Sequence, residues 1–135
     1  MKLLDLIVVD EAYAESPTYH KIMNGSDEKL LKANPELVAK LENSAQEQGI
    51  PVRKARCFTT ESFWSGRTAE QIIEISNADC IEMENYALFV NAIKTGKKAA
   101  SILTVVDSLV AWEEITVARR GDILEQMFEV ALGIL

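Results

Sequence analysis

The 135-residue sequence has no long run of lysine and arginine and no long run of apolar residues. Its formal net charge of −7 argues against binding to nucleic acid or to an anionic membrane surface, because phosphate groups attract basic surfaces. The longest mostly apolar stretch, residues 99–106, is far shorter than the roughly 20 residues of a membrane-spanning helix. The apolar N-terminus is interrupted by Asp5 and lacks a cleavage-site pattern, so we expect no signal peptide.

Cysteine and histidine are also scarce. The two cysteines, Cys57 and Cys80, are separated by a spacing that fits neither a metal-binding nor a redox motif. We expect two buried free thiols, which suits a protein of the reducing cytoplasm. The one histidine, His20, falls in the polar segment 10–25, and we expect a solvent-facing loop residue there rather than a catalytic one.

The composition favours one folded domain. Hydrophobic residues make up 48% of the chain, so disorder is not expected, and 135 residues are enough for a buried core. There is no internal repeat, low-complexity segment or interdomain linker, so residues 1–135 are interpreted as a single domain.

Apolar periodicity and turn residues predict alternating strands and helices, which is typical of a layered α/β domain. Residues 34–36 form a strong helix start and residues 68–71 a capping box. The stretch 99–106 is apolar on both faces, which predicts a buried parallel strand, whereas the basic residues within 52–58 indicate an edge or half-exposed strand. The expected strands are 3–9, 52–58 and 99–106, with an extended segment before Glu82; helices are expected to begin at 35 and 69, to span 84–95 and to fill much of 111–135, with a turn at 29–32 and a loop at 59–66.

The segment 79–85 carries the strongest signal of a binding site. It reads as a short extended stretch that turns directly into a helix, and side chains of a strand alternate between faces, so Glu82 and Glu84 would point the same way, about 6–7 Å apart. Paired carboxylates are costly to bury unless hydroxyls or cations meet them. A sugar diol is one such partner, and the Met83 thioether could contact its apolar face. The alternative is that Glu84 only complements the helix dipole.

Two further features are candidates for a ligand site. Asp107 follows the apolar stretch 99–106, and ligands bind just outside the carboxyl ends of strands in open α/β sheets; the alternative is an N-cap for a following turn. The adjacent aromatics Phe63 and Trp64 lie in the expected loop, where they either form a base-stacking surface or cover the core.

The run IEMEN at 81–85, followed by TVVD at 104–107, resembles the nucleoside phosphorylases of the bacterial purine and uridine type. The resemblance covers nearly the whole chain, but only the C-terminal half or so of a family member. It implies a phosphorylase-like, layered α/β/α fold with a mixed central sheet, here truncated at the N-terminus. Such a chain would expose a sheet edge or an open face that must be covered.

The resemblance implies substrate-binding roles for residues at matching positions. Met83 and Glu84 match the residues that hold the ribose, with Glu84 on the ring hydroxyls, and Glu82 matches a less critical member of the same triplet. With one loop residue deleted, Phe63 matches an aromatic that stacks on base and sugar.

The resemblance also implies two catalytic residues. Asp107 matches a general acid that protonates the ring nitrogen of the departing base, which favours a purine, and desolvation at a partly buried strand end would raise its pKa as this role requires. Arg120, 13 residues later, matches an arginine that closes onto the acid. A surface position for Arg120, or the use of its neighbour Arg119, is the alternative.

The phosphate side of the family's site has no counterpart in this sequence. The family holds phosphate with glycine-rich loops and arginines near the start of the chain and with a Gly-Ser/Thr-Cys-Gly-like turn. The six glycines here are scattered and form no phosphate cradle, and Arg53, Arg56 and Arg67 match no family role. We therefore expect the chain alone to be a poor catalyst.

The implied reaction is phosphorolysis of a purine nucleoside to free base and ribose 1-phosphate. Phosphate would be the co-substrate, with no metal or organic cofactor. The missing half would come from a separate chain, or the chain would associate with itself as a homo-oligomer. Two alternatives stay open: a hydrolytic nucleosidase of the same fold, and a non-catalytic nucleoside-binding or assembly remnant.

Overall fold

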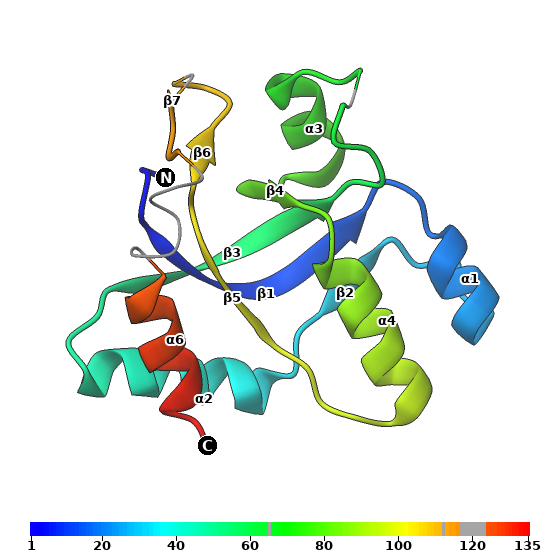
Figure 1. Cartoon of the computed structure of the whole chain (residues 1–135). Helices are drawn as coiled ribbons and strands as arrows, with labels where there is room; N and C mark the ends of the chain where they lie inside the picture. Colours follow the sequence, from blue (N-terminus) through cyan, green and yellow to red (C-terminus); the bar gives the residue numbers. More distant parts are fainter. Residues whose placement is uncertain (65, 112, 117–123) are drawn as a thin grey trace.

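The computed structural model describes residues 1–64, 66–111, 113–116 and 124–135. A mixed sheet forms the centre, and helices surround it (Figure 1). The helices α2 and α6 lie side by side at one end of the view, and α1 and α4 lie together at the other. The predicted α/β class with a mixed central sheet is therefore confirmed. Across these ranges, no helix is long and apolar enough to cross a membrane.

The sheet is organised around β1 (Leu6–Ala14), which uses both of its edges. One edge pairs in parallel with β3 (Val52–Thr59) along the whole strand. The other edge pairs antiparallel with β5 (Ser101–Thr104) and then with β2 (Leu30–Lys32). A short strand, β4 (Cys80–Glu82), pairs in parallel with the last three residues of β3, on the edge that faces away from β1. The three parallel strands β1, β3 and β4 therefore end at one edge of the sheet.

The helices begin and end where the chain supplies caps. The Asn34 side chain accepts from the Leu37 amide at 3.1 Å, and proline follows at the first helical position. Thr68 forms the predicted capping box with Gln71. Gly96 closes its helix in the left-handed conformation, with φ of 63°. The five helices with assigned bounds are α1 (Thr18–Asn24), α2 (Pro35–Glu47), α3 (Ala69–Ser76), α4 (Asn85–Thr95) and α6 (Glu125–Leu132).

The core lies between β1 and the helices that cross it. The first four residues of β1 are all buried, so both faces of this half of the strand are covered. Side chains from α2, α4 and α6 complete the cluster, which includes Leu41, Phe89 and Val130. Leu41 belongs to α2, which begins at residue 35 as predicted.

The segment 10–25 is not the loop that we expected. The strand β1 runs on to Ala14 because Ala12 and Ala14 alternate inward, and α1 follows. His20 is buried rather than solvent-facing: its Nδ1 lies 3.1 Å from Asn24 Nδ2, and its ring meets Tyr86 edge to face. The expected turn at 29–32 is also wrong, since these residues include β2, which pairs with β1.

The stretch 99–106 does contain a strand, but its predicted surroundings are wrong. β5 is antiparallel to β1, and all four of its residues are only half-buried. Its apolar composition reflects a border position beside the core rather than full coverage on both faces. The edge prediction for 52–58 is half right, because β4 pairs only with the end of β3, and Arg53 and Lys54 lie exposed before it.

The long helix expected within 111–135 is also wrong. A small antiparallel pair, β6 (Asp107–Ser108) and β7 (Glu113–Glu114), comes first, and α6 is eight residues long. β-branched residues such as Val110 and Ile115 favour extended structure before residue 117. The positions of Arg119 and Arg120 lie outside the described residues.

Candidate functional site

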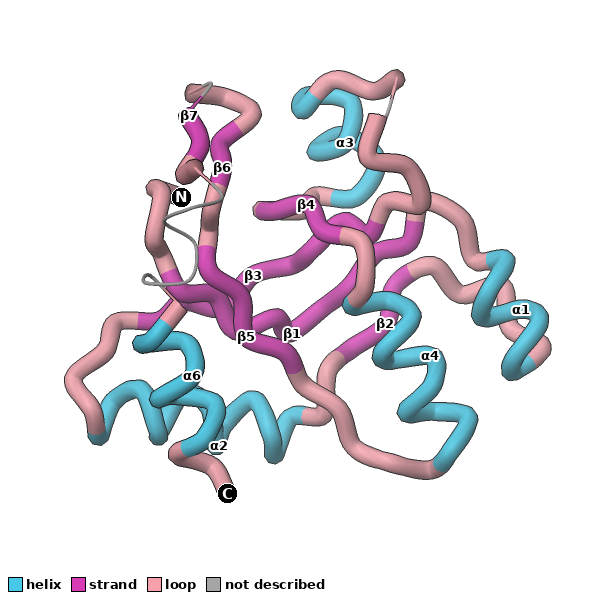
Figure 2. Tube along the Cα trace, viewed as in Figure 1, coloured by secondary structure: helices cyan, strands magenta, loops and turns pink. Residues whose placement is uncertain are grey.

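The carboxyl ends of β1, β3 and β4 bring polar side chains together, and we call this place the carboxyl edge (Figure 2). Glu15 is the first residue after β1. Thr59 is the last residue of β3 and Thr60 follows it, and Glu82 is the last residue of β4. Backbone hydrogen bonds continue past the strands, from Glu15 N to Thr59 O at 3.0 Å and from Thr60 N to Glu82 O at 3.0 Å. This is the edge at which open α/β sheets bind ligands.

The Glu82 carboxylate is held by the protein itself. One oxygen accepts from the Thr59 hydroxyl, and the other accepts from the amides of Glu84, at 2.7 Å, and Asn85, at 2.6 Å. Thr59 Oγ1 in turn accepts from the Tyr86 amide at 3.1 Å. Three successive amides at the start of α4, which a helix leaves without partners, are thereby satisfied. The Glu82 carboxylate therefore has a structural role at the start of α4.

Met83 and Glu84 remain available to a ligand. Met83 is 40% exposed, and Glu84 is exposed at the N-cap position of α4 without bonding the helix amides through its side chain. The Glu84 carboxylate accepts only a neighbouring amide bond, from Met83 at 3.2 Å, among the described contacts. The strand ends at Glu82, so strict alternation does not extend to Glu84. The predicted approach of the two carboxylates stays a prediction.

Glu15 fixes the loop that follows β3. Its carboxylate accepts from Thr60 Oγ1 at 2.8 Å, from the Glu61 amide at 3.4 Å and from Arg67 Nε at 3.3 Å. The hydrogen bond from Thr60, and then the Arg67 guanidinium, hold the pKa of Glu15 below its ordinary value of 4.5.

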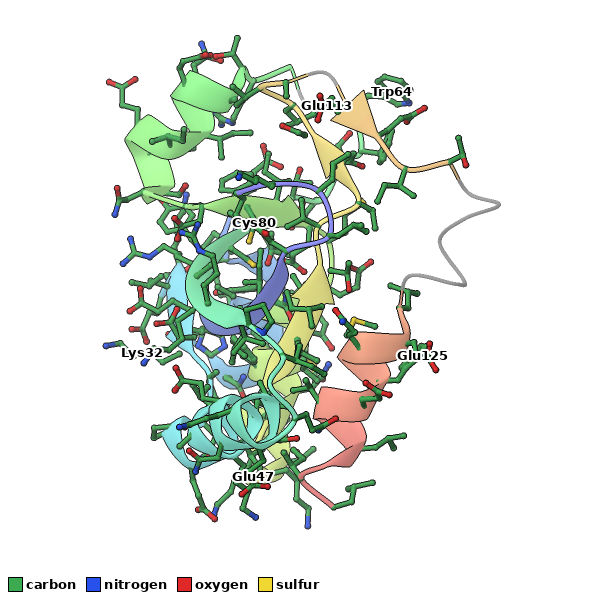
Figure 3. The ribbon with its side chains drawn as sticks, turned by 90° about the vertical axis from the view of Figure 1, so that its left-hand side faces the viewer. Lys32, Glu47, Trp64, Cys80, Glu113 and Glu125 are labelled. Atoms are coloured by element: carbon green, nitrogen blue, oxygen red, sulfur yellow. The ribbon has the colours of Figure 1, made fainter. Side chains whose placement is uncertain are left out.

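The aromatic pair in this loop projects outward. Phe63 is 75% exposed and Trp64 is 87% exposed, and their rings meet edge to face with centroids 5.2 Å apart. Trp64 lies at the outer margin of the molecule in Figure 3. The two aromatics therefore do not cover the core in the described part of this chain, and their stacking role stays a prediction.

Asp107 occupies a different setting from the one expected. It is exposed and begins β6, so the expected partly buried strand end is wrong. Because β5 is antiparallel to β1, its end at Thr104 lies beside Leu6, away from Ala14. Among the described residues, no hydrogen bond or ion pair joins Asp107 to the Glu-Met-Glu triplet. Its catalytic role, and that of Arg120, stay predictions.

Basic residues near the sheet are paired with carboxylates. Arg56 donates from Nε and Nη2 to Glu11 at 2.8 and 2.6 Å. Arg53 lies 3.4 Å from Asp79, and Arg67 contacts Glu15. These arginines thus link strand and loop positions to neighbouring carboxylates. Within the described ranges, no three His, Cys, Asp or Glu side chains cluster so as to hold a metal ion.

Sequence reasoning missed the contacts between β3 and β4. Cys57 and Cys80 are register partners, and their sulfurs lie 2.6 Å apart. Thr59 and Glu82 follow two residues later on each strand. Aligning the strand at 52–58 in parallel with the extended segment before Glu82 would have revealed both pairs.

The chain matches the family model of the phosphorylase superfamily over residues 1–133. The protein therefore belongs to the phosphorylase superfamily. The family predicted from the stretches 81–85 and 104–107 is confirmed.

The curated relatives are bacterial. The chain is 33% identical over 137 residues to a DeoD-type purine nucleoside phosphorylase of Mycoplasma genitalium and 31% identical over 132 residues to one of Bacillus subtilis strain 168. Each match covers 98% of this chain and 56% of the relative. The chain thus spans about half the length of the curated relatives it matches.

Two solved structures share the fold. A purine nucleoside phosphorylase from Toxoplasma gondii, in complex with immucillin-H, superposes with a TM-score of 0.80 at 20% identity, covering 99% of this chain and 56% of that one. A Plasmodium knowlesi homologue of the P. falciparum phosphorylase superposes with a TM-score of 0.78 at 23% identity, covering 99% and 54%.

Proposed function

We propose that this chain supplies the nucleoside side of a purine nucleoside phosphorylase. The observation that carries the proposal is the exposed Met83–Glu84 pair at the carboxyl edge of a chain 33% identical to a DeoD-type purine nucleoside phosphorylase. The reaction is phosphorolysis of the N-glycosidic bond, which gives free purine and ribose 1-phosphate. Phosphate is the co-substrate, and no organic cofactor takes part.

Each site residue has a defined task in this proposal. The Glu84 carboxylate accepts hydrogen bonds from the ribose hydroxyls, and Met83 contacts the apolar face of the sugar. Phe63 stacks on the base. Asp107 protonates the purine ring as it leaves, and Arg120 closes onto that acid. Glu82 holds the loop rather than the sugar.

A second polypeptide provides the phosphate side. Arg53, Arg56 and Arg67 are each paired with a carboxylate, so none offers an uncompensated charge to a phosphate dianion. The second polypeptide is either another copy of this chain or a separate chain that carries phosphate-binding loops. The two cysteines are free thiols, which suits the cytoplasm.

The test is release of free base from inosine, adenosine and uridine by the purified chain at high concentration, with and without phosphate. We expect slow or no release by the dilute chain, and phosphate-dependent release from the purines once the phosphate side is assembled. Glu84→Gln removes that activity.

The outcomes separate the alternatives. Release that does not depend on phosphate identifies a nucleosidase, and full-rate phosphorolysis by the dilute monomer contradicts the need for a second polypeptide. No release under any condition, together with no nucleoside binding, contradicts the proposal as a whole.

A further inference from the structure

We propose that Thr59 is a positioning residue for the nucleoside site, acting through Glu82 on the Met83–Glu84 loop. The inference rests on the proposed function, because it assigns the loop to the nucleoside. Thr59 itself contacts no ligand in this account. Its hydroxyl sets the backbone from which the ligand-binding side chains project.

The position of Thr59 suits this task. It is 7% exposed at the last residue of β3, directly opposite Glu82 in the β3–β4 register. A hydroxyl has one hydrogen to donate and lone pairs to accept. The Thr59 hydroxyl uses both capacities, donating to Glu82 and accepting from the Tyr86 amide at 3.1 Å.

Thr59 thereby connects two elements that the site requires. Its bond to Glu82 orients that carboxylate, whose other oxygen accepts from the Glu84 and Asn85 amides. Its bond to Tyr86 fixes the first turn of α4 directly. With three successive amides held, the backbone around Glu84 has little freedom to rotate.

Removing the hydroxyl has a specific consequence. The buried Tyr86 amide loses its acceptor, and one Glu82 oxygen loses its donor. Leaving both groups without a hydrogen bond is unfavourable, so the backbone rearranges to satisfy them. The loop then shifts relative to the strands. A displacement of about 1 Å in a positioning element costs up to ~100-fold in function.

The substitutions distinguish positioning from simple packing. Thr59→Val keeps the shape and removes the hydroxyl, whereas Thr59→Ser keeps the hydroxyl and removes a methyl group. Thr104→Val is the matched control, because Thr104 Oγ1 is buried with no hydrogen-bond partner in the described part of the chain. Should Thr59→Val fail to fold, Glu82→Gln weakens the same network without changing its size.

The first measurement needs no ligand. Amide hydrogen exchange is followed by NMR at Glu84, Asn85 and Tyr86, with inosine affinity measured in parallel. We expect Thr59→Val to speed exchange at these amides by about tenfold or more and to weaken inosine binding by about 10- to 100-fold. Thr59→Ser restores both, and Thr104→Val changes neither.

Each contrary result has a distinct meaning. Inosine binding that Glu84→Gln weakens but Thr59→Val leaves intact overturns the role of Thr59 and keeps the proposed function. A Thr59→Ser protein as defective as Thr59→Val overturns it too, because packing would then be the cause. Absence of binding by the unaltered chain overturns the proposed function instead, and amide exchange still decides whether Thr59 holds the loop.

Discussion

Glu82 and Glu84 are two glutamates of one triplet, but their carboxylates have opposite roles. Glu82 directs both oxygens to the protein, and its hydrogen bonds with amides and with Thr59 complete the start of α4. The Glu84 side chain makes no hydrogen bond to the helix amides and is exposed to solvent. The Glu84 carboxylate accepts only the neighbouring Met83 amide among the described contacts, so it keeps acceptor capacity beside a fixed backbone and is suited to bind hydroxyls.

Glu15 makes the stability of this edge depend on pH. Its pKa is lowered, so its contribution to the free energy of unfolding is fully present above its ordinary value of 4.5 and is lost as pH falls through the lower folded value. We expect Glu15→Gln to be less stable than the unaltered chain at neutral pH and to lose less stability on acidification. Urea unfolding at a series of pH values below 6 measures the difference.

The control for this prediction is Glu47→Gln, which removes one exposed acid from α2. Glu36 and Glu70, whose pKa values are also lowered, act equally in all three proteins. Equal acid slopes for Glu15→Gln and the unaltered chain would show that Glu15 is not held as described.

Some of these residue roles were accessible from sequence and others were not. Glu84 and Met83 stood out because paired acids around a thioether form a recognisable motif. Thr59 and Glu15 carry no motif, since each acts through a partner on another strand, 23 and 45 residues away in the chain. Such pairs depend on strand register, which sequence alone leaves open.

Gly133 allows α6 to lie against α2. A Cβ at this position would overlap Ser44 Oγ and come within 2.9 Å of Gln48 Nε2. Ser44 and Gln48 donate to carbonyls of α6, at 2.8 and 3.1 Å. We expect Gly133→Ala to lower the free energy of unfolding by about 1–3 kcal/mol, because the overlap forces the helices apart. Chemical denaturation measures the change.

Gly66→Ala is the matched control, because a Cβ there meets nothing within 4 Å. We expect its effect to stay within about 0.5 kcal/mol. A Gly133→Ala protein as stable as this control would mean that α6 does not dock on α2 as described.

The paired strands β3 and β4 bring two thiols into contact. With oxidised glutathione as the oxidant, we expect Cys57 and Cys80 to form one intramolecular disulfide while two glutathione thiols are released. Cys80 is half-buried and reacts first; Cys57 is buried, and its hydrogen bond to Cys80 and its burial raise its pKa. Intact mass after alkylation identifies the product.

Cys80→Ser is the control, and it should leave the remaining thiol largely unmodified. A lasting mixed disulfide with glutathione on Cys80, or disulfide-linked dimers alone, would contradict the contact between the two sulfurs.

Secondary structure was predictable where the sequence contains helix-capping residues. The caps at 34–36 and 68–71 marked helix starts correctly, and the helix predicted over 84–95 is observed as Asn85–Thr95. The loop prediction for 10–25 was wrong because the inward-facing residues of its strand include small alanines, which give a weak strand signal. The prediction of one long helix in 111–135 was wrong because apolar residues of a hairpin and of a short helix together resemble the pattern of a single helix.

At the scale of the whole molecule, the chain forms a mixed sheet with a site along one edge. The parallel strands gather Glu15, Thr59 and Glu82 there, while β5 runs the other way and leads to an exposed Asp107. The fold class was predictable because the family motif fixes it. The direction of β5 was not, because an apolar run fits either a parallel strand or a border strand.

The central claim is that the Glu84 carboxylate binds the ribose of a purine nucleoside. Calorimetric titration of inosine into the chain tests it directly, with Glu84→Gln beside it and Glu74→Gln, an exposed acid of α3, as the control. We predict saturable binding that Glu84→Gln weakens by about tenfold or more, since a hydrogen bond to a charged group contributes about 1.5–3 kcal/mol. Equal affinity in all three proteins would contradict the account.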